Sequence, residues 1–133
     1  MRSREEHNAQ VLGVRICRMR WPILDTLMWA IPNGGSREAR TGAMLKSEGV
    51  TKGVWDLMVA VGYDFGILSV KWCPGMIIEM KSKSAFARKN CGLTDEQIVY
   101  RDAMAGQEWR YEVCDSANAM VAAVERHMKE AGY

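Results

Sequence analysis

The segment 76–81, with the sequence MIIEMK, constrains the fold of this chain more than any other. Successive side chains of a strand point to opposite faces, so its apolar residues would occupy both faces. A strand that is apolar on both faces is typical of a sheet covered by helices on both sides. Glu79 and Lys81 would project from one face, where a buried charged pair is costly unless it lies at the strand end or binds something.

The remaining patterns predict a mixed order of helices and strands. Helices are expected near 3–19, from a cap at Ser36 to Gly49, from Thr94, and along a final stripe of Ala117, Met120, Val121, Val124 and Met128. Further strands are expected at 24–31, 57–61 and 109–114, and the excursion 62–75 allows a hairpin over 67–72. A basic loop should follow residue 81. This order predicts an α/β (mixed α+β) fold with a central mixed sheet flanked by helices.

Length and composition favour one domain, 1–133, in the cytoplasm. The 133 residues suit a single core, and the four cysteines show no C-x-x-C spacing that would indicate zinc. The N-terminus is charged, with no secretory signal, and no apolar run is long enough for a membrane helix. We therefore expect free thiols and no membrane partner.

Asp56, Glu79 and Lys81 form the candidate chemical constellation. If the strands that begin after Asp56 and that contain Glu79 are neighbours, the two carboxylates and the ammonium group meet at one point. Carboxylates hold hard cations such as Mg²⁺, and a nearby lysine can position water or stabilise phosphate charge. Two simpler interpretations remain: Asp56 as a turn residue, and Glu79 with Lys81 as an ion pair on a solvated face.

The order of the motifs resembles the VRR-NUC (virus-type replication-repair nuclease) family of the PD-(D/E)XK nuclease superfamily. The matching strings are EHNAQ at 6–10, IPNGG at 31–35, GVTKGVWDL at 49–57, IEMK at 78–81 and LTDEQ at 93–97. The resemblance covers nearly the whole chain and implies a restriction-endonuclease-like core. Because no accessory domain is visible, the chain looks like a stand-alone, phage or prophage type of member.

The resemblance implies a role for each residue of the constellation. Asp56 and Glu79 match the metal-binding carboxylates, the carbonyl of Met80 matches an additional ligand, and Lys81 matches the catalytic lysine. The implied cofactor is Mg²⁺ or Mn²⁺. The family pattern carries proline at the position of Trp55. This departure puts in question the backbone shape of the loop that precedes Asp56.

Three further residues match supporting positions of the family. Glu6 is similar to a helical glutamate that supports the metal site through water, with Glu5 as its rival; either one is otherwise a favourable acid in a first helical turn. Gln97 is similar to a glutamine that faces the site. It also completes a capping box with Thr94, so structural and site roles both stay open.

Basic residues near the constellation indicate a polyanionic partner. Those expected to contact DNA phosphates are Lys83, Arg88, Lys89, Lys52 and Arg37. The resemblance implies a metal-dependent endodeoxyribonuclease, a homodimer acting on branched DNA such as four-way junctions. The alternatives are a non-catalytic DNA-binding or scaffold protein that keeps the fold, and a nuclease for flaps or single strands.

Overall fold

The computed structural model describes residues 3–32 and 39–133, except for the side chains of residues 39 and 40. Its main sheet has the order β1-β2-β5-β6, formed by Met28–Ala30, Leu57–Val59, Met76–Met80 and Arg110–Cys114. β1 and β2 pair antiparallel, as do β2 and β5, whereas β5 and β6 run parallel. The sheet is therefore mixed, as the element order predicted.

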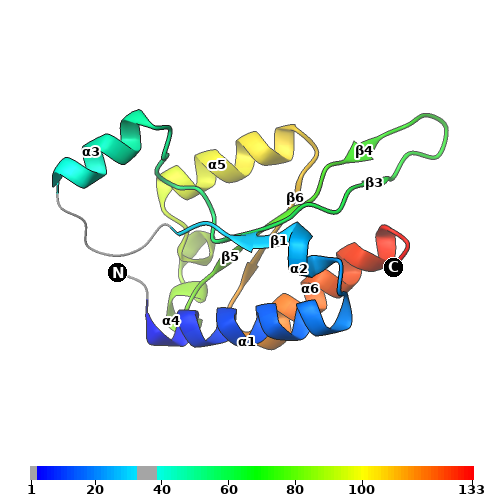
Figure 1. Ribbon diagram of the computed structural model, residues 1–133, viewed down its shortest axis with the longest axis horizontal. Helices are drawn as coiled ribbons and strands as arrows, with labels where there is room; N and C mark the ends of the chain where they lie inside the picture. Colours follow the sequence, from blue (N-terminus) through cyan, green and yellow to red (C-terminus); the bar gives the residue numbers. More distant parts are fainter. Residues whose placement is uncertain (1–2, 33–38) are drawn as a thin grey trace.

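Helices cover both faces of this sheet (Figure 1). α1 (Arg4–Arg20) and α6 (Ala117–Glu130) lie together on one face, and α5 (Asp95–Gly106) lies on the other. α3 (Ala39–Ser47) follows the segment that the structure does not describe, which contains the predicted cap Ser36. Residues 76–80 are all buried, as expected for a strand covered on both sides.

Gly13 allows α1 and α6 to pack closely. A Cβ atom built at this position would lie 2.5 Å from the sulfur of Met120, so a larger residue would require the end of the Met120 side chain to move. The α6 face that packs here contains four of the five residues of the predicted stripe, together with Ala123 and His127. Val121 is only half-buried, so it lies at the margin of the buried face and not within it as predicted.

Two local predictions were wrong. The segment predicted as one strand at 24–31 begins with a helical turn, α2 (Leu24–Leu27), and only then becomes β1. The amide of Leu27 bonds the carbonyl of Ile23 at 3.1 Å, and a short apolar run does not distinguish such a turn from a buried strand. The predicted basic loop instead contains α4 (Lys83–Phe86) and a 3₁₀ helix, η1 (Lys89–Gly92).

The excursion 62–75 forms a separate hairpin. Its strands are β3 (Tyr63–Asp64) and β4 (Trp72–Cys73), which pair antiparallel outside the main sheet. The hairpin projects beyond the body of the molecule (Figure 1). Because it follows the end of β2 and precedes β5, it lies at the opposite end of these strands from Asp56 and Glu79.

Candidate active site

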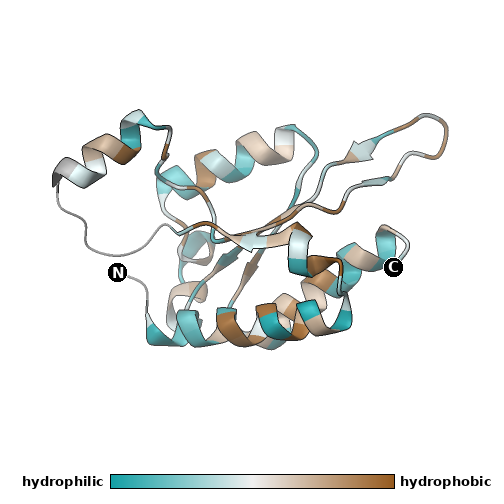
Figure 2. Ribbon diagram, in the orientation of Figure 1, coloured by the Kyte–Doolittle hydropathy of each residue, from teal (hydrophilic) through white to brown (hydrophobic). Residues whose placement is uncertain are grey.

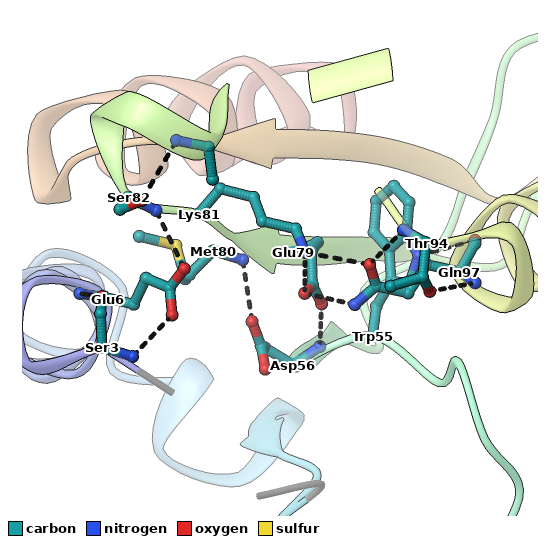
Figure 3. Close-up of polar contacts among 11 residues, drawn as sticks. Ser3, Glu6, Trp55, Asp56, Glu79, Met80, Lys81, Ser82, Thr94 and Gln97 are labelled. Atoms are coloured by element: carbon teal, nitrogen blue, oxygen red, sulfur yellow. Dashed lines mark hydrogen bonds and ion pairs between the residues drawn. The ribbon is translucent and has the colours of Figure 1, made fainter. Parts of the chain in front are cut away.

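Asp56 and Glu79 meet at the edge between two neighbouring strands. The register that pairs Leu57 with Ile78 brings Asp56, just before β2, beside Glu79 on β5. The amide of Asp56 donates to Oε1 of Glu79 at 3.1 Å, and Oδ2 of Asp56 accepts from the amide of Met80 at 2.9 Å (Figure 3). Both carboxylates are buried, with exposed fractions of 9% and 5%. The strands are thus neighbours, which is the condition that the predicted constellation required.

Gln97 joins the carboxylate of Glu79 to the ammonium group of Lys81. Its Nε2 donates to Oε2 of Glu79 at 2.7 Å, and its Oε1 accepts from Nζ of Lys81 at 3.0 Å (Figure 3). Lys81 also lies 3.6 Å from Oε2 of Glu79. The side-chain amide of Gln97 therefore points its NH₂ group at the carboxylate of Glu79 and its oxygen at the ammonium group of Lys81. These bonds hold the three side chains as one cluster.

The same glutamine begins α5. The hydroxyl of Thr94 accepts from the amide of Gln97 at 3.2 Å, and Oε1 of Gln97 accepts from the amide of Thr94 at 3.0 Å. Oε1 thus has two donors, Thr94 and Lys81. Gln97 therefore has both of the predicted roles: it completes the capping box of α5 and it faces the site. One side chain can do this because α5 begins directly beside the carboxylates.

Trp55 contacts the first turn of α5, a contact that the sequence did not predict. Its side chain is wholly buried, and its indole Nε1 donates to the main-chain oxygen of Gln97 at 3.0 Å. Its ring also meets Tyr111 edge to face, with centroids 6.1 Å apart. The available signal was its place next to Asp56, where the family pattern has proline; the contact itself joins residues 42 positions apart.

Burial and neighbouring charge oppose the ionised form of Glu79. Desolvation and the nearby charge of Asp56 raise its pKa to about 8, against the lowering effect of Lys81. Two buried carboxylates that cannot both ionise easily provide a suitable place for a cation, which would relieve their repulsion. Asp56, Glu79 and the Met80 carbonyl are oxygen donors, as Mg²⁺ and Mn²⁺ require. Among described residues, no cluster of three or more His, Cys, Asp or Glu is arranged to hold a metal.

The glutamates of α1 lie beside the chain segment that follows Lys81. Glu6 accepts from the amides of Ser82 and Ser3, both at 3.0 Å, so it completes the α1 capping box and also holds the end of β5 (Figure 3). Glu5 accepts from the amide of Lys83 at 3.2 Å. Each glutamate therefore contacts a different residue at the start of α4: Glu6 contacts Ser82, which directly follows Lys81, and Glu5 contacts the next residue, Lys83.

The predicted DNA-contacting residues divide into two groups. Lys83 begins α4, Arg88 is the cap residue before η1, and Lys89 begins η1, so all three follow the site strand, and all three are exposed. Lys83 has one weak partner, Asp115, at 3.7 Å. Lys52 is exposed in the segment before Asp56. Arg37 lies outside the described residues.

A comparison with solved structures supports the fold. A structure titled "VRR_NUC domain protein" matches with a TM-score of 0.72 and 16% identity, over 98% of this chain and 93% of that one. No family model and no curated protein sequence matches the chain. None of the described helices has the length and apolar character that a membrane crossing needs. The resemblance seen in the motifs is therefore confirmed as a shared fold: this chain has the fold of that VRR_NUC domain protein.

Proposed function

We propose that this protein is a metal-dependent endodeoxyribonuclease of the VRR-NUC kind. The observation that carries the proposal is the cluster in which Gln97 joins Lys81 to Glu79, beside Asp56. This arrangement brings two carboxylates and one ammonium group together near the end of a buried strand. The shared fold with a VRR_NUC domain protein agrees with this use of the cluster.

Asp56, Glu79 and the Met80 carbonyl would hold Mg²⁺ or Mn²⁺. When bound, the ion supplies Lewis-acid polarisation of the phosphate and a more acidic water. The side chain of Lys81 is only 12% exposed, and its ammonium group is restrained by Gln97. It is therefore preorganised to orient the attacking water or to stabilise charge that develops on the phosphate. Glu6 supports the site by fixing Ser82 next to Lys81.

DNA binding in this proposal comes from exposed cations on the chain segments that precede Asp56 and follow Lys81. Lys83, Arg88 and Lys89 follow the site strand, and Lys52 precedes Asp56. A DNA backbone that contacts both segments would pass close to the carboxylates. Such contacts bind phosphates without reading bases, which favours recognition of DNA shape, including four-way junctions. A homodimer that makes paired cuts stays the expected assembly.

The test compares cleavage of end-labelled DNA by wild type and Asp56→Asn, in Mg²⁺ and in Mn²⁺. Four-way junction, flap, single-stranded and linear duplex substrates share one sequence. Asp102→Asn is the matched control, because the side chain of Asp102 is 64% exposed on α5. We expect metal-dependent cutting by wild type and control only, with the junction cut fastest.

The same experiment tests the alternatives. Equal cutting by wild type and Asp56→Asn would contradict the proposed site. Cutting confined to flaps or single strands would favour the flap nuclease. Salt-sensitive binding of DNA by a folded protein, without cutting in either metal, would favour a DNA-binding protein that keeps the nuclease fold.

A further inference from the structure

A pocket lies between α3 and the loop that leads to Asp56. Its volume is about 800 Å³, and we call it the α3 pocket. The residues that line it include Gly42, Lys46, Val50, Thr51, Lys52 and Gly53. Of these, Lys52 belongs to the residues expected to contact DNA, and the others have no role in the carboxylate cluster.

The loop side of the α3 pocket is held by main-chain contacts. The amide of Val50 donates to the carbonyl of Leu45 at 3.0 Å, so the loop folds back on α3. Gly53 has a φ of +84°, and a Cβ atom built there would clash with the main chain of Glu96 in the first turn of α5. The chain that leaves α3 therefore runs against the helix start that carries Gln97 before it reaches β2 (Figure 1).

The α3 pocket is basic on one side and apolar on another. Lys46 lines it from α3 and Lys52 from the loop, and no acid is among the described residues that line it. Neither lysine forms an ion pair within the part of the chain that the structure describes. Figure 2 shows that α3 ends in hydrophilic residues. Val50 is 43% exposed and adds an apolar wall. A phosphate joined to a sugar matches this combination.

Gly42 is the residue of the pocket that packing does not explain. It lies inside α3, one turn before Lys46 and on the same face. Glycine is less favourable than alanine in a helix interior, and a Cβ atom built at Gly42 would meet no described atom within 4 Å. A close approach of a ligand to the helix does require a small residue. Lys46 alone would indicate less, because a lysine also stabilises the last turn of a helix.

We propose that the α3 pocket binds one nucleotide unit of the DNA strand that passes the carboxylate cluster. The phosphate of this nucleotide lies between Lys46 and Lys52, and its sugar lies against the helix at Gly42. The inference rests on the proposed nuclease function and adds a substrate contact outside the cluster.

The pocket lies close enough to the cluster to hold the same strand. Three residues of chain, about 11 Å when fully extended, join Gly53 to Asp56. This length is the rise of about three nucleotides along one strand of duplex DNA. The bound nucleotide therefore fixes the strand near the scissile phosphate and helps to select the bond that is cut.

The first test measures binding of a fluorescein-labelled four-way junction by anisotropy over a range of salt, without metal ion. Lys46→Gln and Lys52→Gln are combined in one chain, and the control combines Lys71→Gln with Lys129→Gln, two other exposed lysines. Lysines that share one phosphate should together reduce the slope of log K against log salt by about 0.9, and the control should not. A reduction twice as large would indicate two separate phosphates, and an unchanged slope would indicate none. Either result would overturn the proposal.

The second test uses the glycine. Gly42→Gln places a good helix former in the pocket, and Gly106→Gln makes the same change at the end of α5, where a Cβ atom also meets no described atom within 4 Å. We expect both chains to unfold at or above the wild-type temperature. Only Gly42→Gln should bind the junction at least about fivefold more weakly, because its side chain occupies the space of the sugar. Equal affinities of the two variants would remove Gly42 from the contact.

Thymidine monophosphate in the same assay distinguishes a DNA strand from a free nucleotide as the ligand. We expect this nucleotide to displace the junction only at millimolar concentrations, because it replaces one phosphate contact among several. Displacement at micromolar concentrations would show that the pocket binds free nucleotides, and it would overturn the assignment to the DNA strand.

Binding without metal also separates this inference from the proposed function. If Asp56→Asn cleaves DNA like wild type while the Lys46 and Lys52 double variant has the reduced salt slope, the carboxylate cluster is wrong and the pocket is supported. If Asp56→Asn abolishes cleavage while the double variant keeps the wild-type slope, the pocket is wrong and the cluster is supported.

Discussion

The indole nitrogen of Trp55 donates a 3.0 Å hydrogen bond to the main-chain oxygen of Gln97, the residue whose side chain joins Glu79 to Lys81. The residue before the first carboxylate therefore fixes the helix start that supplies the fourth member of the cluster. The pattern with proline at this position offers no such donor. Trp55 is a positioning residue in this interpretation.

Trp55→Phe tests that role, because it keeps an aromatic ring but removes the donor. Loss of this part-buried hydrogen bond should cost about 0.5–1.5 kcal/mol of unfolding free energy. We also expect kcat to fall about tenfold, since Gln97 is less restrained, while KM for DNA changes little. Chemical denaturation and steady-state kinetics measure both. A variant that loses stability but keeps the wild-type kcat would show that Trp55 is structural only.

Gln97→Met should remove the link between Lys81 and Glu79 and one half of the α5 capping box. We expect kcat to fall by about 10²–10³-fold, the usual range for loss of a preorganised polar contact in a site. Gln107→Met, at the exposed end of the same helix, is the control for the substitution itself. If both variants cleave DNA at the same rate, the bridge has no role in activity.

The raised pKa of Glu79 predicts opposite pH trends without and with metal. The folded state holds a proton on Glu79 up to about pH 8, so this group's contribution to stability is present near pH 4.5 and is lost as pH rises through 8. Metal binding displaces that proton, so the stabilisation by Mg²⁺ should grow between about pH 6.5 and 8.5. Thermal unfolding with and without Mg²⁺ measures both trends. A metal effect that is constant across this range would contradict the prediction.

His127 predicts a loss of stability on the acid side. It is wholly buried, its Nε2 lies 2.7 Å from the carbonyl of Val61, and desolvation by burial lowers its pKa below 6.5. Because the folded state resists protonation, this contribution is present above pH 6.5 and is lost as pH falls. His127→Gln keeps a donor but does not titrate. Urea unfolding at about pH 7.5 and pH 5.5 should show a smaller pH difference for this variant, and equal differences would exclude His127 as the cause.

The exposed cations near the site should contribute to DNA binding without sequence preference. Arg88→Ala and Lys89→Ala should each weaken binding to different sequences equally. Each substitution that removes a cation from a phosphate should also reduce the slope of log K against log salt by about 1. Lys129→Ala is the control, because Lys129 is 72% exposed and lies near the end of α6. Unchanged salt slopes for Arg88→Ala and Lys89→Ala would place the DNA elsewhere.

Features set by neighbouring residues could be predicted from the sequence. The apolar strand around Glu79 and the capping box of Thr94 and Gln97 depend on strand alternation and on contacts three residues apart. The sequence also offered Asp56 as the partner of Glu79, on the condition that their strands are neighbours, and the resemblance implied a metal-binding role for both. The turn of α2 was missed because a short, largely apolar run fits a helical turn or a strand equally well.

Only the tertiary structure decided which side chains meet. The contact of Trp55 with Gln97, the bonds of Glu6 to Ser82, and the exposure of Leu68 depend on residues or surfaces far apart in the chain. An alternating pattern predicts which side chains share a face of a strand. It does not predict which strand pairs with it or which helix covers it. The sequence by itself determined that a buried strand would end in a carboxylate and a lysine. The packing of β2, β5 and α5 determined that Asp56 and Gln97 would join them, because hydrogen bonds across these elements form only when the sheet and helix assemble.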